Sequence, residues 1–319
     1  MPTFEHKTVL LNELVDALIL KAGDTAVDCT AGGGGHTSLL LERVRPTGKV
    51  FACDRDLRAI ESLQEKFYKQ IVNNQLGLVH SPFSDFTKYI PQEVSIHGIC
   101  ADLGVSSPQL DESNRGFSFM RDGPLDMRMS PESQDPSAAE VIANYSSQDL
   151  EKIIRSLGEE PKARFVANAI VKQRENSPIT TTIELANLVA KAIHYKKKSK
   201  KHPATKTFQA LRIYVNKELE EIRILLEQAF ACLSPGGRLA IISFHSLEDR
   251  IVKDFFKEKS GKKPGQSLPR DLPLTESELK SFQNIQARII KPFPIIPKEE
   301  EISSNPRSRS AKLRVLEKL

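Results

Sequence analysis

A turn of four consecutive glycines at residues 32–35 constrains the fold of this chain more than any other feature. The turn follows a short apolar run that ends near Asp28, and a helical pattern begins at Thr37. A strand that leads through glycines into a helix is typical of a βαβ unit, and a ligand can approach such a turn closely because glycine has no Cβ atom. The sequence therefore predicts an α/β fold with a ligand-binding loop after its first strand.

Apolar runs that predict strands alternate with helical patterns through the first third of the chain. The predicted strands cover residues 25–29, 50–53, 77–80 and 96–101. Strands that alternate with helices form a parallel sheet, and ligands of such sheets bind at the carboxyl ends of the strands. The loops after these four strands are therefore expected to share one edge of the sheet.

A second acid identifies the class of ligand. Asp54 ends the second predicted strand, about 20 residues beyond the glycines, where an acid accepts hydrogen bonds from the hydroxyls of a ribose. Dinucleotide loops space their glycines as G-x-G-x-x-G around a pyrophosphate. Here the glycines are contiguous and Asp28 precedes them, which suits the sulfonium and ammonium groups of S-adenosylmethionine. We therefore predict a methyltransferase; a nicotinamide-dependent oxidoreductase is an alternative that binding of NAD would reveal.

Length and composition exclude several other classes of protein. The 319 residues suffice for one core with an insertion. No apolar run approaches the roughly 18 residues of a membrane helix, and the first residues do not resemble a signal peptide. We expect a soluble, cytoplasmic protein with no membrane partner. The cysteines have neither zinc-site nor disulfide spacing, so we expect buried reduced thiols and no metal site; they are Cys29, Cys53, Cys100 and Cys232.

The basic residues are concentrated in two places, although the net charge is only +5. A run of lysines occupies residues 196–201, and four basic residues lie near the C-terminus: Arg307, Arg309, Lys312 and Arg314. Phosphate neutralisation is the main source of non-specific affinity for nucleic acid. A nucleic-acid substrate is therefore expected, with the lysine run in contact with phosphates. The sequence leaves a homodimer open.

The middle of the chain contains no convincing strand between about residues 110 and 203. Ser146 and Thr181 each begin a capping pattern, and residues 159–174 form a further helical stretch. A long helix over residues 207–233, a strand over 238–244 and a final strand pair then restore the α/β pattern. We predict a discontinuous methyltransferase core, 1–110 and 204–319, interrupted by a helical substrate-recognition or RNA-recognition insertion, 111–203.

Asp102 begins the run Asp-Leu-Gly-Val-Ser-Ser-Pro-Gln directly after the fourth predicted strand. An amine on a nucleobase is a poor nucleophile because its lone pair is delocalised, so its methylation needs acceptors for the amine hydrogens. Asp102 and the carbonyls of residues 106–108 can supply such acceptors. A helix-capping turn with a structural proline explains the same residues equally well.

Two further side chains are candidates at this edge. His245 follows a predicted strand, where a role as a base or as a hydrogen-bond partner of substrate stands beside a structural role. Ser246 is expected to cap the next helix with Asp249. Phe83 follows the third strand and either stacks on adenine or belongs to the core.

Several longer blocks of sequence resemble one family, the bacterial small-subunit ribosomal RNA cytosine-N4-methyltransferases. The blocks are residues 34–37, 54–56, 102–109, 115–129, 178–182, 202–212, 243–250 and 305–314. The resemblance covers nearly the whole chain and is weak only in the lysine run and in residues 259–284. It implies a Rossmann-like core and methyl transfer from S-adenosylmethionine to N4 of one cytidine in the decoding region of the ribosomal RNA.

The resemblance also implies site residues. The implied cofactor contacts are Gly34, Gly35, His36, Asp54, Phe83, Asp102 and Gln109. Our own candidates for the residues near the reacting amine are Asp102 and His245. Residues 117–129 become a candidate lid or RNA-contacting loop.

Two alternative functions stay open. A non-catalytic RNA-binding ribosome-assembly factor is disfavoured by the intact acids, and a DNA amino-methyltransferase by the missing Pro-Pro-aromatic tetrad.

Overall fold

The computed structural model describes residues 7–194, 202–261 and 285–319, so the lysine run lies outside the described residues. The chain forms two compact units. We call Met1–Gly104 with Leu219–Leu319 the sheet unit, and Val105–Glu218 the helical unit.

These boundaries differ from the predicted ones at about residues 110 and 203. Helix α10 (Thr205–Val215), which we expected in the methyltransferase core, belongs to the helical unit. It packs against α7 (Ser147–Gly158), and its Phe208 and Leu211 are buried in the helical core. The helical unit therefore extends beyond α10, because the apolar face of this helix is buried in the helical core.

A seven-stranded sheet forms the centre of the sheet unit, with strand order β3-β2-β1-β4-β5-β7-β6. The strands are β1 (Thr25–Asp28), β2 (Lys49–Asp54), β3 (Leu76–His80), β4 (Ile96–Asp102), β5 (Leu233–Ser243), β6 (Ala287–Ile295) and β7 (Lys312–Lys318). Strands β1 to β5 are parallel, whereas β7 is antiparallel to both β5 and β6. The predicted α/β class is confirmed, but the sheet is mixed because β7 is antiparallel to its two neighbours, β5 and β6.

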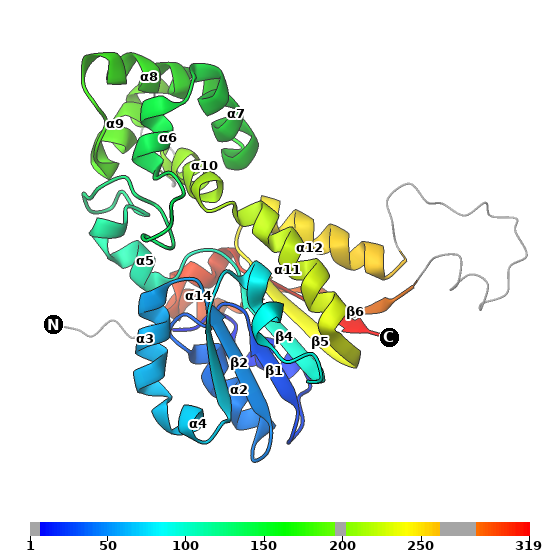
Figure 1. Cartoon of the computed structure of the whole chain (residues 1–319). Helices are drawn as coiled ribbons and strands as arrows, with labels where there is room; N and C mark the ends of the chain where they lie inside the picture. Colours follow the sequence, from blue (N-terminus) through cyan, green and yellow to red (C-terminus); the bar gives the residue numbers. More distant parts are fainter. Residues whose placement is uncertain (1–6, 195–201, 262–284) are drawn as a thin grey trace, which may run out of the picture. The chain divides into compact units, whose positions relative to one another are not determined.

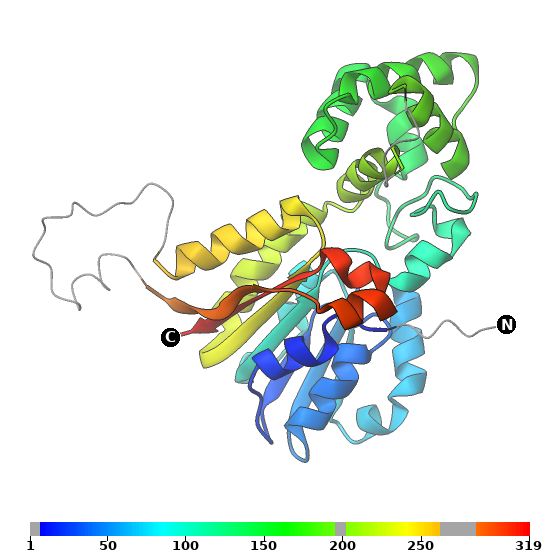
Figure 2. The ribbon, with the colours of Figure 1, turned by 180° about the vertical axis from the view of Figure 1, so that it is seen from behind.

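Helices cover both faces of this sheet. Helices α11 (Glu218–Cys232) and α12 (Ser246–Lys259) lie on one face (Figure 1), and α1 (Leu11–Ala17) and α2 (Gly35–Val44) lie on the other (Figure 2). Successive residues of a strand point to opposite faces of the sheet. Because helices cover both faces, the strand residues on both faces are apolar. The connections contain α3 (Leu57–Lys66), α4 (Tyr68–Val72), α14 (Glu299–Ser304) and the 3₁₀ helices η1 (Phe83–Tyr89) and η3 (Pro306–Ser310).

The predicted burial of the cysteines is confirmed for three of the four. Cys29, Cys53 and Cys100 are free and buried, whereas Cys232 is half-buried. Burial raises the pKa of each of these thiols, because it disfavours the thiolate.

The helical unit is built from short helices. They are α5 (Ser107–Asp111), η2 (Ser113–Arg115), α6 (Ala138–Asn144), α7, α8 (Ala163–Asn176), α9 (Thr182–Ala192) and α10. The predicted caps are confirmed: Ser146 accepts the N–H of Asp149, and Thr181 accepts that of Glu184. Helix α6 was not predicted, although its Ser137-x-x-Glu capping box is visible in the sequence.

The single helix predicted over residues 207–233 is wrong. Helix α10 ends at Val215, and Lys217 has a left-handed φ of 52°, before α11 begins. Asn216 is 2% exposed, and its side-chain amide donates to the carbonyl of Met127 at 2.8 Å and accepts the N–H of Met129 at 2.8 Å. Tertiary hydrogen bonds to a distant segment hold the break, which helical periodicity alone does not reveal.

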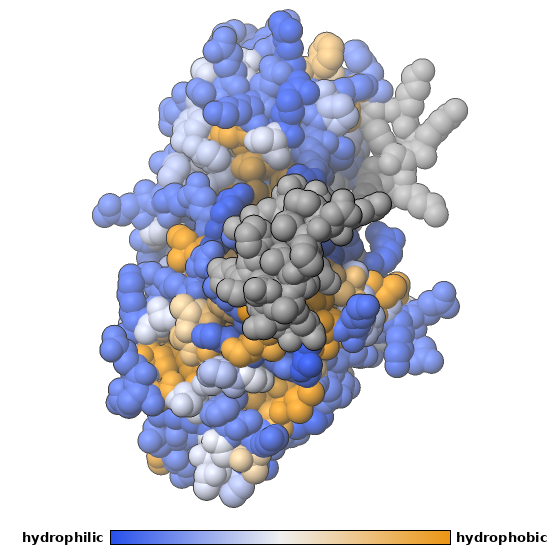
Figure 3. All heavy atoms as spheres, turned by 90° about the vertical axis from the view of Figure 1, so that its right-hand side faces the viewer, coloured by the Kyte–Doolittle hydropathy of each residue, from blue (hydrophilic) through white to orange (hydrophobic). Residues whose placement is uncertain are grey.

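The surface carries apolar side chains as separate patches. In Figure 3 these patches lie among hydrophilic residues on the visible face of the molecule. Within the residues that the structure describes, no helix is both long enough and apolar enough to cross a membrane.

Candidate active site at the strand ends

Three parallel strands of the sheet unit end in aspartate: β1 in Asp28, β2 in Asp54 and β4 in Asp102. Backbone hydrogen bonds continue past the strand ends, since the N–H of Ala31 donates to the Cys53 carbonyl at 2.9 Å. The hydroxyl of Thr30 accepts the N–H of Asp102 at 2.6 Å and so joins the loops after β1 and β4. The predicted shared edge is confirmed for these loops.

The glycine loop combines left-handed backbone with close packing. Gly32 and Gly34 have φ values of 48° and 74°, which other residues adopt only at a cost. A Cβ atom on Gly34 would lie 2.6 Å from Leu63 Cδ2, and one on Gly35 would overlap the Thr8 side chain. A Cβ on Gly33 would meet nothing within 4 Å. The packing of the protein itself therefore requires glycine at two positions, and Gly33 is where the main chain is open to a ligand.

Asp28 has a different role from the one we inferred from its sequence position. The residue is completely buried, its Oδ2 accepts the Thr37 hydroxyl at 2.7 Å, and its Oδ1 accepts the N–H of Thr30 at 3.2 Å. Both oxygens are thus engaged within the loop. Asp28 holds the glycine turn against α2 and acts on a ligand only through its charge.

Asp54 faces the glycine loop. Its Oδ2 accepts the N–H of Gly32 and its Oδ1 the N–H of Asp56, both at 2.8 Å. Burial raises the pKa of the Asp54 carboxyl to about 6, although these two hydrogen bonds lower it. Further acceptor capacity remains on both oxygens, so the carboxylate can also receive hydroxyl groups of a ligand.

Asp102 is the most perturbed acid at this edge. Burial raises the pKa of its carboxyl well above the usual range, and the negative charges of Asp28 and Glu248 raise it further. Its buried Oδ1 has no hydrogen-bond partner among the described residues. An unsatisfied buried carboxylate oxygen is costly, and a cation or an N–H donor on a ligand removes that cost.

His245 is the N-cap of α12, so the predicted cap, Ser246, is wrong. The His245 ring accepts the N–H of Glu248 at 3.4 Å, and Glu248 in return accepts the N–H of His245 at 3.2 Å. Asp249 instead pairs with Arg314 at 2.8 Å. Glu248 was missed in the sequence, although the His-x-x-Glu spacing is that of a capping box with an unusual first residue.

The remaining predicted site residues lie in different surroundings. His36 is 4% exposed, and its Nε2 lies 3.2 Å from the carbonyl of Val9. Phe83 is partly buried and packs against the core of the sheet unit. Gln109 belongs to the helical unit, where its Oε1 accepts the N–H of Ser106 at 3.0 Å. All predicted site residues except Gln109 therefore belong to the sheet unit.

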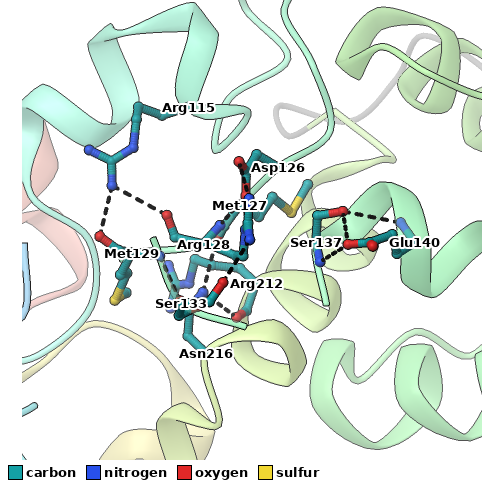
Figure 4. Close-up of polar contacts among 10 residues, drawn as sticks. All are labelled: Arg115, Asp126, Met127, Arg128, Met129, Ser133, Ser137, Glu140, Arg212 and Asn216. Carbon is teal, nitrogen blue, oxygen red and sulfur yellow. Dashed lines mark hydrogen bonds and ion pairs between the residues drawn. The ribbon is translucent and has the colours of Figure 1, made fainter. Parts of the chain in front are cut away.

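The segment predicted as a lid, residues 117–129, is anchored inside the helical unit (Figure 4). Arg115 donates to the carbonyl of Met129 at 2.9 Å, and Asn216 accepts the N–H of the same methionine. Only the middle of the segment reaches solvent, with Met120 83% exposed. The fully exposed residues of the segment therefore lie in its middle.

The strand order and the acids at the strand ends define a Rossmann-like methyltransferase fold in which carboxylates take the place of a pyrophosphate-binding loop. The chain belongs to the MraW methylase family, whose model matches residues 3–319. Membership confirms the resemblance seen in the sequence and makes the protein an S-adenosylmethionine-dependent methyltransferase.

Three solved structures match this chain over nearly its whole length. A putative rRNA methylase from Clostridium thermocellum has 13% identity and a TM-score of 0.45, and the match covers 98% of this chain and 99% of that one. SMU.1697c, a putative methyltransferase from Streptococcus mutans in complex with SAH, has 14% identity and a TM-score of 0.44, and the match covers 98% of this chain and 99% of that one. An rRNA methylase from Streptococcus thermophilus has 12% identity and a TM-score of 0.43, and the match covers 98% of this chain and 98% of that one.

Proposed function

We propose that this protein methylates the exocyclic N4 of one cytidine in the decoding region of small-subunit ribosomal RNA. The observation that carries the proposal is the Asp102 carboxylate at the end of β4, which has a buried oxygen without a hydrogen-bond partner among the described residues. Such a group is suited to a substrate amine. Family membership and the sequence blocks shared with the cytosine-N4 enzymes support the choice of base.

The residues at the strand ends suit S-adenosylmethionine. Asp54 would accept the ribose hydroxyls, and the main chain at Gly33, Gly34 and Gly35 would lie along the ligand. The negative charge of Asp28 favours its cationic groups, and these groups would in turn favour the ionised form of Asp102, whose pKa is raised without them. The proposed contacts of His36, Phe83 and Gln109 rest on the family resemblance. When bound, the cofactor supplies an electrophilic methyl group.

Catalysis in this proposal consists mainly of positioning. The target cytidine leaves its helix, because an enzyme cannot reach a stacked and paired amine. Asp102 accepts an N–H of the amine and orients the nitrogen toward the methyl group. As the new N–C bond forms, the amine nitrogen loses one proton, and the raised pKa of Asp102 suits the carboxylate to receive it.

The partner in this proposal is the small ribosomal subunit, with the helical unit as its RNA-recognition part. The lysine run at residues 196–201 would neutralise phosphates. If the lysines contact phosphates, replacing them with glutamine weakens RNA binding and makes the RNA affinity depend less steeply on salt concentration, whereas cofactor binding is unchanged.

The test is methylation of small subunits purified from cells that lack this gene. Mass spectrometry of the RNA should find one new methyl group on N4 of a single cytidine with the wild-type protein, and Asp102→Asn should abolish it. A wild-type protein that binds S-adenosylmethionine but leaves this RNA unmodified would support the assembly-factor alternative. Methylation of a matched DNA in preference to the RNA would support the DNA enzyme.

A further inference from the structure

Two buried polar atoms at neighbouring strand ends form no hydrogen bond among the described residues. They are Oδ1 of Asp102 and Nε2 of His245, although this Nε2 lies 3.0 Å from Oε1 of Glu248, and the His245 side chain is only 12% exposed. Buried polar atoms in folded proteins are nearly always hydrogen-bonded. An acceptor and a ring nitrogen without hydrogen bonds at the carboxyl edge of one sheet indicate a pair of groups that a ligand can engage.

The two residues belong to loops that touch each other. Asp102 pairs with Ile242 in the β4–β5 ladder, and the N–H of Leu103 donates to the Ile242 carbonyl at 3.0 Å. One residue further on, a Cβ on Gly104 would lie 3.8 Å from Phe244 Cδ2, beside His245. The loop after β4 therefore runs directly along the start of α12.

Hydrogen bonding fixes which nitrogen of His245 carries the proton. Nδ1 accepts the backbone N–H of Glu248 at 3.4 Å, so Nδ1 is the unprotonated nitrogen. In the neutral ring, the proton is then on Nε2. The fully buried carboxylate of Glu248 has its Oε1 3.0 Å from Nε2, and this negative charge favours the same arrangement. His245 consequently offers a donor, and Asp102 an acceptor.

We propose that Asp102 and His245 read the edge of the target base, with Glu248 as the residue that positions His245. Asp102 accepts a hydrogen from the amine, and Nε2–H of His245 donates to the adjacent ring nitrogen. Cytosine presents this amine beside an unprotonated N3, whereas uracil presents a carbonyl beside an N3–H. The inference rests on the proposed function and makes His245 a specificity residue rather than the base that we considered from the sequence.

The first test compares two targets and two proteins. One small-subunit RNA carries cytidine at the target position, and the other carries 3-deazacytidine, which keeps the amine but replaces N3 by C–H. His245→Ser retains a strong helix cap but cannot reach the base. The wild type should lose about tenfold or more in kcat/KM on 3-deazacytidine, as expected for one lost buried hydrogen bond. His245→Ser should be slow on both targets and should not distinguish them. An unchanged preference for cytidine in this variant would overturn the inference.

The second test does not depend on turnover. In protein labelled with ¹⁵N-histidine and saturated with SAH, the His245 resonance should show the Nε2–H tautomer, and cytidine should shift it more than uridine or 3-deazacytidine does. An Nδ1–H tautomer, or equal shifts with the three nucleosides, would contradict the assignment. Glu248→Gln should weaken the tautomer preference while the backbone cap remains. Failure of the wild type to methylate RNA at all would instead count against the proposed function.

Discussion

The pH dependence of cofactor affinity is the sharpest prediction for Asp54. Its carboxyl has a pKa of about 6 in the folded protein, against an ordinary 3.8. Because the folded-state pKa is raised, the protonated form is favoured by folding, and the stabilisation present at low pH is lost as the pH rises through about 6. At pH 7 the buried charge costs about 3 kcal/mol of folding free energy.

Ribose hydroxyls that donate to Asp54 stabilise its ionised form, so cofactor binding should offset part of this cost. Affinity for S-adenosylhomocysteine should therefore rise with pH, by about tenfold between pH 5 and pH 7. Asp54→Asn should weaken binding at pH 7 by about tenfold or more, because a hydrogen bond to a charged group is replaced by one to a neutral amide.

Isothermal titration calorimetry of both proteins between pH 5 and pH 7.5 would measure this. Asp102 also has a raised pKa, so the informative quantity is the difference between the wild-type and Asp54→Asn profiles, with Asp102→Asn as the matched control. Parallel profiles for the wild type and Asp54→Asn would refute the reasoning, since Asp54 would then not be coupled to the ligand.

Three predictions concern stability, and the first two are measured by chemical unfolding. Asp249→Asn should destabilise the sheet unit by about 3–5 kcal/mol, because it leaves the buried Arg314 guanidinium without its ionic partner; a loss below 1 kcal/mol would contradict this. Gly35→Ala should cost about 1–3 kcal/mol through overlap with Thr8, and Thr8→Gly should restore much of it. Asn216→Ala removes three side-chain hydrogen bonds, two of them buried, and should make the helical unit more sensitive to limited proteolysis, whereas unchanged cleavage would show that they contribute little.

Much of the site was predictable because it depends on local pattern and on one rule of sheet topology. Asp54 and Asp102 end apolar runs, and parallel strands bring their carboxyl ends to one edge. The glycine turn and the capping boxes at Ser146 and Thr181 are likewise contained within a few neighbouring residues. These features needed no knowledge of distant contacts.

The contacts that refine the site come from residues far apart in the chain. The sequence does not show that Gly35 must be small because Thr8 packs against it. Nor does it show that Asn216 ends α10 by binding the main chain near residue 128. Each of these contacts becomes defined only when the chain folds, so pattern and spacing could not predict it.

The sequence by itself determined the α/β class, the edge where the acids gather and the family, since these follow from periodicity and from motifs that are local in the chain. Only the tertiary structure decided what each polar group does there. Asp28 turned inward to Thr37, and Asp102 was left with a buried oxygen that no described residue satisfies. Burial and hydrogen-bond partners set the charge and the proton position of a side chain, and both arise from packing in three dimensions.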